Sequence, residues 1–169
     1  MNKNLDKILK RVQKASRYTG GELNSVVKNP EDVSIRYAFA FPDTYEVGMS
    51  HLGIKILYHI LNQREDTYCE RVFAPWIDME EEMRKENIPL FTNETQTSVK
   101  EFDFLGVTLQ YEMCYSNVLN MLDLAGIPLK SADRGEDDPF VNAGGPCAYN
   151  PEPTAEIFDF FTMGEGEAV

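Results

Sequence analysis

The chain has 169 residues, 43% of them hydrophobic and 11% aromatic, which is enough for one domain with a hydrophobic core and rather short for two. Its formal net charge of -12 disfavours non-specific binding to nucleic acid or to anionic lipid. The three cysteines match neither a disulfide framework nor a zinc or iron-sulfur spacing, and no apolar run reaches the roughly 18 residues of a membrane span. We therefore expect a cytoplasmic protein with no membrane segment and no metal ligands of its own.

The first 17 residues differ from the acidic remainder, because they carry six Lys or Arg side chains against one Asp. Four apolar residues within them recur at helical spacing: Leu5, Ile8, Leu9 and Val12. We expect an amphipathic helix over residues 5–12, within a basic lead-in of residues 1–33 that docks on the domain. The alternative is an arm that contacts nucleic acid or a protein partner through its cations.

From residue 34 onward, strand-like and helix-like segments alternate. The segment SIRYAFAF, residues 34–41, is β-branched and aromatic with little charge, and predicts a strand buried on both faces. An apolar stripe over residues 51–62 predicts a helix, which Ser50 can cap. Residues 42–50 are expected to form the loop between them.

Two further strand-and-helix units follow, with strands at residues 68–75 and 104–109. A capping-box pattern that begins at Asp78 predicts the start of the first helix. Ser116 is expected to cap the second helix, which Gly126 should end in a left-handed turn. The order is again strand, loop, helix.

Residues 140–143 and 158–163 predict two more strands, with a short helix that begins after Asn150. Residues 34–169 thus alternate five strands with helices, which is the pattern of a doubly wound, mainly parallel α/β sheet in a three-layer Rossmann-like or flavodoxin-like fold. Ligands of such sheets bind outside the carboxyl ends of the strands. We therefore expect the functional residues in the segments that follow strands.

The segments that follow the strands carry three short patterns. Asp43, Tyr45 and Gly48 form D-x-Y-x-x-G, which resembles the DxHxxG loop of cobalamin-binding domains with Tyr in place of His. Residues 108–110 stand where those domains have a Ser-x-Leu segment, and the pair at 144–145 matches their two glycines. The order and position of all three patterns indicate a cobalamin-binding-like domain.

The resemblance implies a cofactor site made of the following residues: Asp43, Tyr45, Gly48, Ser50, Thr108, Gln110, Gly144, Gly145 and Pro146. In the family the histidine binds cobalt, whereas a neutral phenol is a poor cobalt ligand. We therefore expect no protein histidine on cobalt and a lower axial face that Tyr45 covers or hydrogen-bonds. Gly48 would let the backbone approach the corrin or its tail, and Gly144 and Gly145 would make room for the nucleotide loop.

Plainer interpretations of the same residues stay open. Tyr45 can be an ordinary packed aromatic residue, and Gly144-Gly145-Pro146 a simple turn after a strand. His51, at a helix start, is either a contact for phosphate or substrate or a surface residue. A packed tyrosine, a simple turn and a surface histidine would need no ligand at these positions.

Nearly the whole chain resembles the N-terminal region of a family of radical S-adenosylmethionine (SAM) proteins. The resemblance rests on segments such as FPDTYEVGMSHLGIKILYHILN, AGGPCAYNPEP and MGEGEAV. It implies an accessory domain without catalysis of its own, followed in the same chain by a radical SAM domain that holds a four-iron four-sulfur cluster and S-adenosylmethionine. The full-length protein would then be an iron-sulfur enzyme, and this chain a fragment that ends just before that domain.

Two other functions remain open. The first is a degenerate α/β module that has lost its cofactor and serves for docking, or for recognition of RNA or protein with help from the basic helix. A receiver or nucleotide-binding domain has less support, because the sequence lacks an acidic pair with a trailing Lys and any G-x-G-x-x-G or Walker loop. An open crevice over the strand ends would favour the cofactor, and one plugged by Tyr45, Tyr111 or Tyr149 would favour docking.

Overall fold

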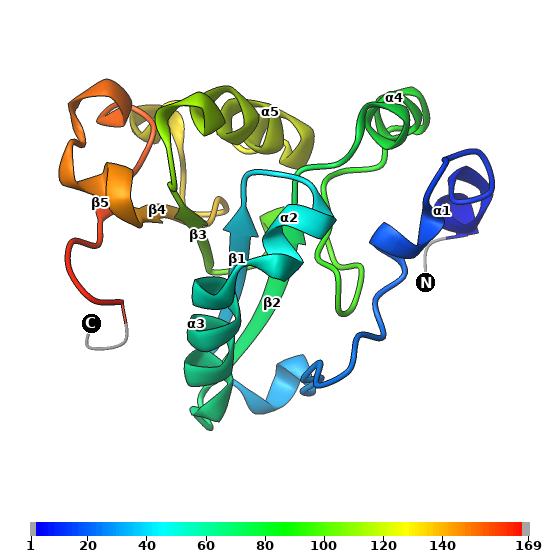
Figure 1. Ribbon diagram of the computed structural model, residues 1–169, viewed down its shortest axis with the longest axis horizontal. Helices are drawn as coiled ribbons and strands as arrows, with labels where there is room; N and C mark the ends of the chain where they lie inside the picture. The colour runs from blue at the N-terminus through cyan, green and yellow to red at the C-terminus, as the bar shows by residue number, and fades with distance from the viewer. Residues whose placement is uncertain (1–2, 167–169) are drawn as a thin grey trace.

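A computed structural model describes residues 3–166 and contains one sheet of five parallel strands with helices on both faces (Figure 1). The strands are β1 (Ile35–Phe41), β2 (Thr67–Phe73), β3 (Phe104–Thr108), β4 (Phe140–Gly144) and β5 (Phe160–Phe161). Their order across the sheet is β2-β1-β3-β4-β5, and every neighbouring pair is parallel. This is the flavodoxin-type order of a doubly wound sheet. The predicted three-layer α/β fold is confirmed.

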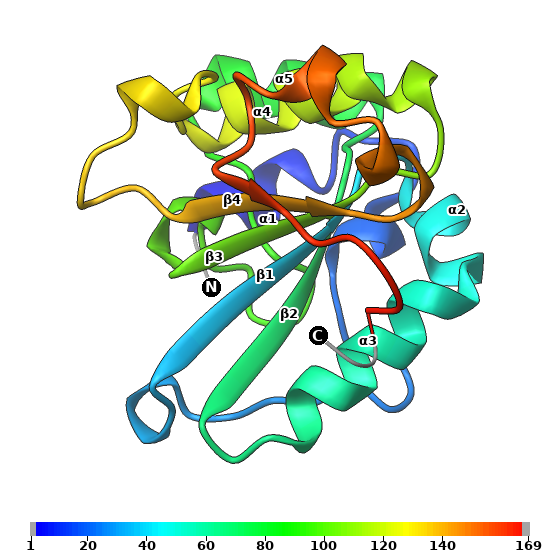
Figure 2. The same ribbon diagram turned by 90° about the vertical axis from the view of Figure 1, so that its left-hand side faces the viewer.

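Five α-helices surround the sheet in the described part of the chain. They are α1 (Lys3–Ile8), α2 (Tyr45–Ser50), α3 (Leu52–Gln63), α4 (Ile77–Glu86) and α5 (Tyr115–Ala125). Figures 1 and 2 show α4 and α5 over one face of the sheet and α3 over the other, and α1 contacts α4. The two faces are therefore covered unequally.

The apolar residues of the strands fall into two cores of different extent. The larger core lies between the sheet and α1, α4 and α5, and takes in Ala38, Leu105 and Val141 from three strands. The smaller core lies between α3 and strands β1 and β2, around Phe39 and Ile54. Within residues 3–166, this smaller core includes nothing from β3, β4 or β5. Helix α3 therefore covers only part of its face of the sheet.

Residues 45–50, expected to belong to a loop, form the short helix α2. Ser50, expected to cap the next helix, is the last residue of α2, and its hydroxyl donates to the backbone carbonyl of Glu46 at 2.6 Å. Helix α3 begins at Leu52 without a side-chain cap. The predictions of a loop and of a Ser50 cap are wrong, because a serine within a helix can bond the carbonyl four residues earlier.

Two further cap predictions are wrong and one is confirmed. Asp78 is the second residue of α4 rather than its cap, and its carboxylate accepts a hydrogen bond from the backbone N–H of Gln13 at 2.7 Å. Ser116 lies inside α5, where its hydroxyl donates to the carbonyl of Met113 at 3.5 Å. Gly126 ends α5 with a φ of 67°, the left-handed turn that its position predicts.

Several segments are shorter or more exposed than expected. Helix α1 ends at Ile8, because the chain beyond it turns toward α4 and tertiary contacts override local propensity. A single 3-10 turn, Glu152–Thr154, replaces the short helix expected after Asn150, and β5 pairs with β4 through only two residues. The first half of β1, Ile35–Tyr37, is only half-buried, and its residues Ile35 and Tyr37 lie on the face that α3 leaves open.

The buried guanidinium of Arg71 on β2 joins distant parts of the chain. It donates to Glu94 at 2.6 Å and to the hydroxyl of Ser25 at 3.1 Å, and it lies 4.4 Å from the centroid of the Tyr58 ring on α3. Burial raises the pKa of the Glu94 carboxyl, and the nearby Arg71 opposes that rise. A charge in this position is tolerated only because its partner is present.

Replacing Arg71 by Met should therefore destabilise the domain by about 3–5 kcal/mol at pH 7, because it leaves a buried carboxylate without its cation. The loss should be smaller near pH 5, since losing the cation raises the pKa of Glu94 further and protonation then removes the charge. Urea unfolding at the two pH values measures both effects. Arg84→Met is the matched control, because Arg84 pairs with acids at the surface and should contribute less than about 1 kcal/mol. Equal losses in the two variants would contradict this account.

Candidate functional site

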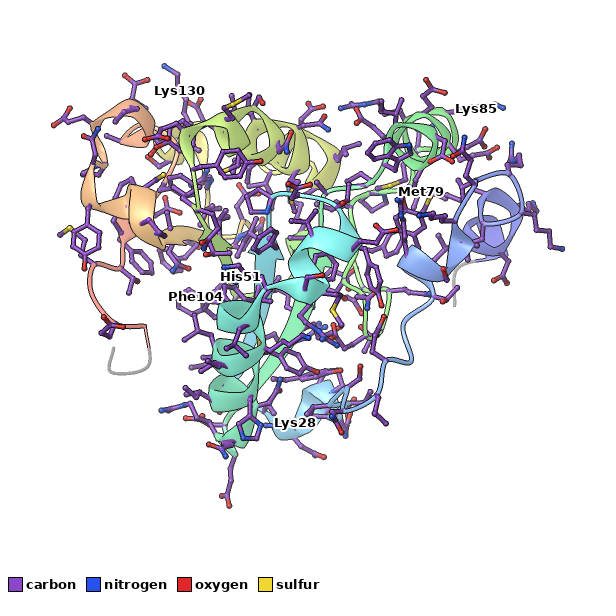
Figure 3. All side chains as sticks on the ribbon, viewed as in Figure 1. Lys28, His51, Met79, Lys85, Phe104 and Lys130 are labelled. Atoms are coloured by element: carbon purple, nitrogen blue, oxygen red, sulfur yellow. The ribbon has the colours of Figure 1, made fainter. Side chains whose placement is uncertain are left out.

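A groove of about 720 Å³ lies where α3 leaves its face of the sheet uncovered. One wall is α3, the floor is the sheet, and the remaining wall is the chain after β5, through Thr162, Gly164 and Gly166. The floor takes alternate residues from the strands: Tyr37, Phe39, Phe104, Gly106, Thr108, Asn142, Gly144 and Phe160. Figure 3 shows Phe104 and His51 on the side of the sheet where α3 lies, and both line the groove.

The floor of the groove is built by a tyrosine that lies across a glycine. A Cβ on Gly106 would overlap the hydroxyl end of the Tyr37 ring, so only glycine at 106 lets Tyr37 cross β3. The Tyr37 hydroxyl donates to Oδ1 of Asn142 at 3.1 Å, and its ring stacks on Phe104 with centroids 5.9 Å apart. Burial raises the pKa of Tyr37 to about 12, so the hydroxyl stays a neutral donor near pH 7.

Four of the predicted site residues come together at the groove: Thr108, Gln110, Gly144 and Gly145. The Gln110 amide donates to the Thr108 hydroxyl at 2.6 Å. Gly145 has a φ of 90°, and a Cβ there would lie 2.9 Å from the carbonyl of Leu109, so the turn requires glycine. A Cβ on Gly144 would make ordinary van der Waals contact, with the backbone carbonyl oxygen of Thr162 nearest at 3.8 Å. The pair therefore combines a turn that requires glycine with a groove position that would accept a side chain.

The other five predicted site residues lie outside the groove. Tyr45 packs edge-on against Phe73 at 5.5 Å between ring centroids, and a Cβ on Gly48 would overlap that same Phe73 ring. Both residues thus fit α2 against the end of β2. The Asp43 carboxylate accepts the backbone N–H of Thr44 at 2.6 Å, which braces the turn after β1.

The last two predicted site residues, Ser50 and Pro146, also serve local structure. Ser50 bonds within α2, and Pro146 begins the 3-10 turn Pro146–Tyr149 that follows β4. The proline fits that position because its fixed φ suits the first residue of a helical turn. Of the residues in the predicted site, four therefore line the groove, and the others belong to α2 or to the turns after strands.

The groove residues absent from the predicted site include three with polar side-chain groups: His51, Tyr37 and Asn142. The His51 ring lies 5.2 Å from Phe41, and its buried Nδ1 has no hydrogen-bond partner among the described residues. Asn142 and Tyr37 each place a polar group within an apolar strand, and this is the signal that could have identified them. The contact between them joins β1 to β4, which no local pattern reveals.

Three cations of the basic N-terminal segment pair with acids of the same chain. Arg17 and Lys14 lie 2.9 and 3.2 Å from the Glu46 carboxylate on α2, and Arg11 reaches Glu82 on α4 at 2.8 Å. The hydrogen bond from Arg17 holds the pKa of Glu46 at about 2, well below its ordinary value. These pairs fix the segment against the domain, as the docking interpretation expects.

The described residues contain neither a cluster of metal-ligand side chains nor a helix suited to a membrane. Within residues 3–166, no three His, Cys, Asp or Glu side chains come together as metal ligands do. None of the helices in that range has the length and apolarity needed to cross a membrane.

Residues 53–169 match the family model described as radical SAM proteins, N-terminal. The chain belongs to this family. The match includes the groove residues Thr108, Asn142 and Gly144 of this radical SAM N-terminal domain, whereas Tyr37 and Tyr45 precede the matched range. The chain is thereby shown to be a radical SAM-associated protein.

Among curated proteins, the uncharacterized protein MJ0966 of Methanocaldococcus jannaschii is 28% identical over 131 residues. The aligned part covers 77% of this chain and 24% of that protein, so the chain spans about a quarter of the relative's length. No solved structure matches the chain. The comparisons thus show the family of the chain.

Replacing Gly106 by Ala should destabilise the domain by about 1–3 kcal/mol, because the new Cβ would displace Tyr37 from Asn142 and Phe104. Urea unfolding followed by circular dichroism measures the free energy of unfolding. Gly135→Ala is the control, since nothing lies within 4 Å of the Cβ position there and the change should stay within about 0.5 kcal/mol. The account of the groove floor fails if both variants are equally stable.

Acidification should loosen the basic segment from α2. The folded pKa of Glu46, about 2, lies below its ordinary value, so its pairing stabilises the fold above about pH 4.3 and is lost as the pH falls from there toward 2. Glu46 is 44% exposed, which limits its contribution to less than about 1 kcal/mol. Hydrogen-exchange protection of residues 14–18, measured against pH, reports the effect.

A variant and a matched control separate this pairing from general acid effects. At pH 6, Glu46→Gln should already show the reduced hydrogen-exchange protection of residues 14–18 that the wild type shows only at low pH. Glu156→Gln removes another surface carboxylate, paired with Lys130, and should leave that protection unchanged. Full protection of residues 14–18 in Glu46→Gln at pH 6 would show that the ion pairs do not hold the segment.

Proposed function

We propose that this domain binds cobalamin as the accessory module of a radical SAM enzyme, with the nucleotide tail of the cofactor in the groove between α3 and the sheet. The observation that carries the proposal is the open groove of about 720 Å³ beside the carboxyl ends of β3 and β4. Thr108, Gln110 and the pair Gly144-Gly145, which resemble cobalamin-domain patterns, meet at this groove. Ligands of doubly wound sheets bind at this edge.

The residues present fit a nucleotide-like tail. The volume is within the range of small-molecule sites, and the lining is largely apolar, with aromatic rings in the floor, aliphatic side chains on α3 and a few polar groups, as such sites usually are. None of Tyr45, Tyr111 and Tyr149 lines the groove. The crevice is therefore open rather than plugged, which favours cofactor binding over a module that only docks.

The loops beyond the strand ends offer a surface for the corrin ring. Tyr111, Met113 and Tyr149 follow β3 and β4 and are 45%, 82% and 67% exposed. Exposed apolar side chains beside a groove are typical of a ligand surface. These residues would cover one face of the corrin while the groove holds its tail.

No histidine stands at the position that binds cobalt in cobalamin domains. Tyr45 occupies it and packs against Phe73, so this chain would hold the cofactor by its tail and ring face rather than by an axial imidazole. Bound cobalamin would supply a cobalt centre that can carry an alkyl group. The chain's own residues would orient that centre toward a radical SAM domain, the proposed partner that would hold the iron-sulfur cluster and S-adenosylmethionine.

The position of Tyr45 also favours a second candidate function. A domain that has lost the axial histidine and packs its half-buried replacement against Phe73 could serve only to dock a radical domain or its substrate. Recognition of RNA by the basic segment has less support, because Arg11, Lys14 and Arg17 already pair with acids of the chain. The two candidates differ in whether the groove takes a ligand.

Titration of the chain with hydroxocobalamin, followed by absorbance and calorimetry, tests the proposal. Saturable binding is expected, and Gly144→Leu should weaken it at least tenfold, because position 144 has room for a side chain that would then fill the groove. Gly135→Leu, at an open surface position, should bind like the wild type. Absence of binding at high micromolar cobalamin would instead support the docking module.

The same complex tests the missing axial ligand. Reduced to cob(II)alamin, the bound cofactor should give an electron paramagnetic resonance spectrum without nitrogen splitting, since neither the protein nor the detached base would ligate cobalt. His51→Ala should leave that spectrum unchanged. Nitrogen splitting that disappears in His51→Ala would identify His51 as an axial ligand and overturn this part of the account.

A further inference from the structure

Asn142 is a buried polar residue in the middle of β4. It is 7% exposed, and its neighbours Val141 and Ala143 are fully buried on the other face of the strand. Its Oδ1 accepts the hydrogen bond from Tyr37. Its Nδ2 has no acceptor among the described residues, although Asn142 lines the groove. The carboxamide thus presents an unused donor to whatever occupies the groove.

The surroundings of that donor are largely aromatic. Tyr37 and Phe104 lie with their rings 16° from parallel, and Phe104 stacks in turn on Phe140 at 5.7 Å. Gly106 pairs in register with Asn142, so no side chain of β3 stands beside the amide. An aromatic floor with one donor suits a planar ring that accepts a hydrogen bond at its edge.

We propose that Asn142 donates a hydrogen bond from Nδ2 to an unprotonated ring nitrogen of a flat heteroaromatic base that lies against Tyr37 and Phe104. The inference rests on the proposed function and deepens it, since it names the class of cofactor. A benzimidazole or purine base that has left cobalt carries such a nitrogen, whereas a phenolic base has none. The groove therefore selects cobamides with nitrogen-containing bases and keeps that base away from cobalt.

Tyr37 is a positioning residue in this arrangement. Its hydroxyl occupies Oδ1 of Asn142 and so turns the NH₂ group of the carboxamide toward the groove. A base that offers no acceptor would leave this amide buried and unsatisfied, which is the usual source of strong discrimination between ligands of similar shape. Specificity would thus come from one amide whose orientation is fixed by Tyr37 on β1, which reaches across β3.

The test compares three ligands on the chain: cobalamin, a phenolyl cobamide, and cobinamide, which has no base. The wild type should bind cobalamin at least tenfold more tightly than either of the others. Asn142→Leu, which keeps the size and removes the donor, should lose at least tenfold in affinity for cobalamin and bind cobinamide as before. Tyr37→Phe should lose several-fold in affinity for cobalamin, which is less than the loss in Asn142→Leu. Its affinity for the other two ligands should not change.

Cobinamide binding shows in each variant that the fold is intact, and Asn142→Asp supplies a second change of the same size that removes the donor. Equal affinity of the wild type for cobalamin and cobinamide would overturn this inference, together with the placement of the nucleotide tail in the groove, and would leave standing the proposal that the domain binds a corrinoid. Wild-type affinity for cobalamin in both Asn142 variants would also overturn it. If no corrinoid binds the wild type, both the inference and the proposed function fail.

Discussion

The close approach of Tyr37 to Gly106 is the contact on which the candidate site depends. Because β3 has no side chain at 106, the Tyr37 ring crosses it and reaches Asn142 on β4, so one residue links three strands. The ring forms a floor at that level of the sheet without filling the space above it. Since α3 packs only on β1 and β2, this floor stays accessible. A ligand groove is the result of one missing side chain and one partly covered face.

The opposite edge of the sheet supplies the rigidity that such an open groove needs. Arg71 on β2 holds Glu94, Ser25 and the Tyr58 ring of α3, which fixes the helix that forms one wall of the groove. The basic segment is held to α2 by Glu46, so its charge serves the fold. The domain thus combines a tightly bonded half, over β1 and β2, with an open half over β3 to β5, and sites built on rigid elements hold their geometry best.

The sequence is informative wherever periodicity and turn chemistry are local. The five strands, the parallel α/β architecture, the left-handed turn at Gly126 and the strand-end position of Gly144 and Gly145 follow from such patterns. The helix α2 does not, because Tyr45 and Gly48 adopt it through their packing on Phe73, a residue of another strand. Resemblance to a known loop placed Tyr45 at the cofactor, whereas tertiary contacts place it outside the groove. The Tyr37 and Asn142 pair joins residues 105 positions apart, beyond the reach of any local rule.

The central claim is that the groove on the α3 face takes the tail of a corrinoid. The most direct measurement is a ¹⁵N-¹H correlation spectrum of the labelled chain during titration with hydroxocobalamin. The account predicts that the amides of Gly106, Asn142 and Gly144, and the side-chain amide of Asn142, shift together and saturate. Shifts confined to α2 and Phe73, with the groove amides unmoved, would contradict it and return the site to the D-x-Y-x-x-G segment.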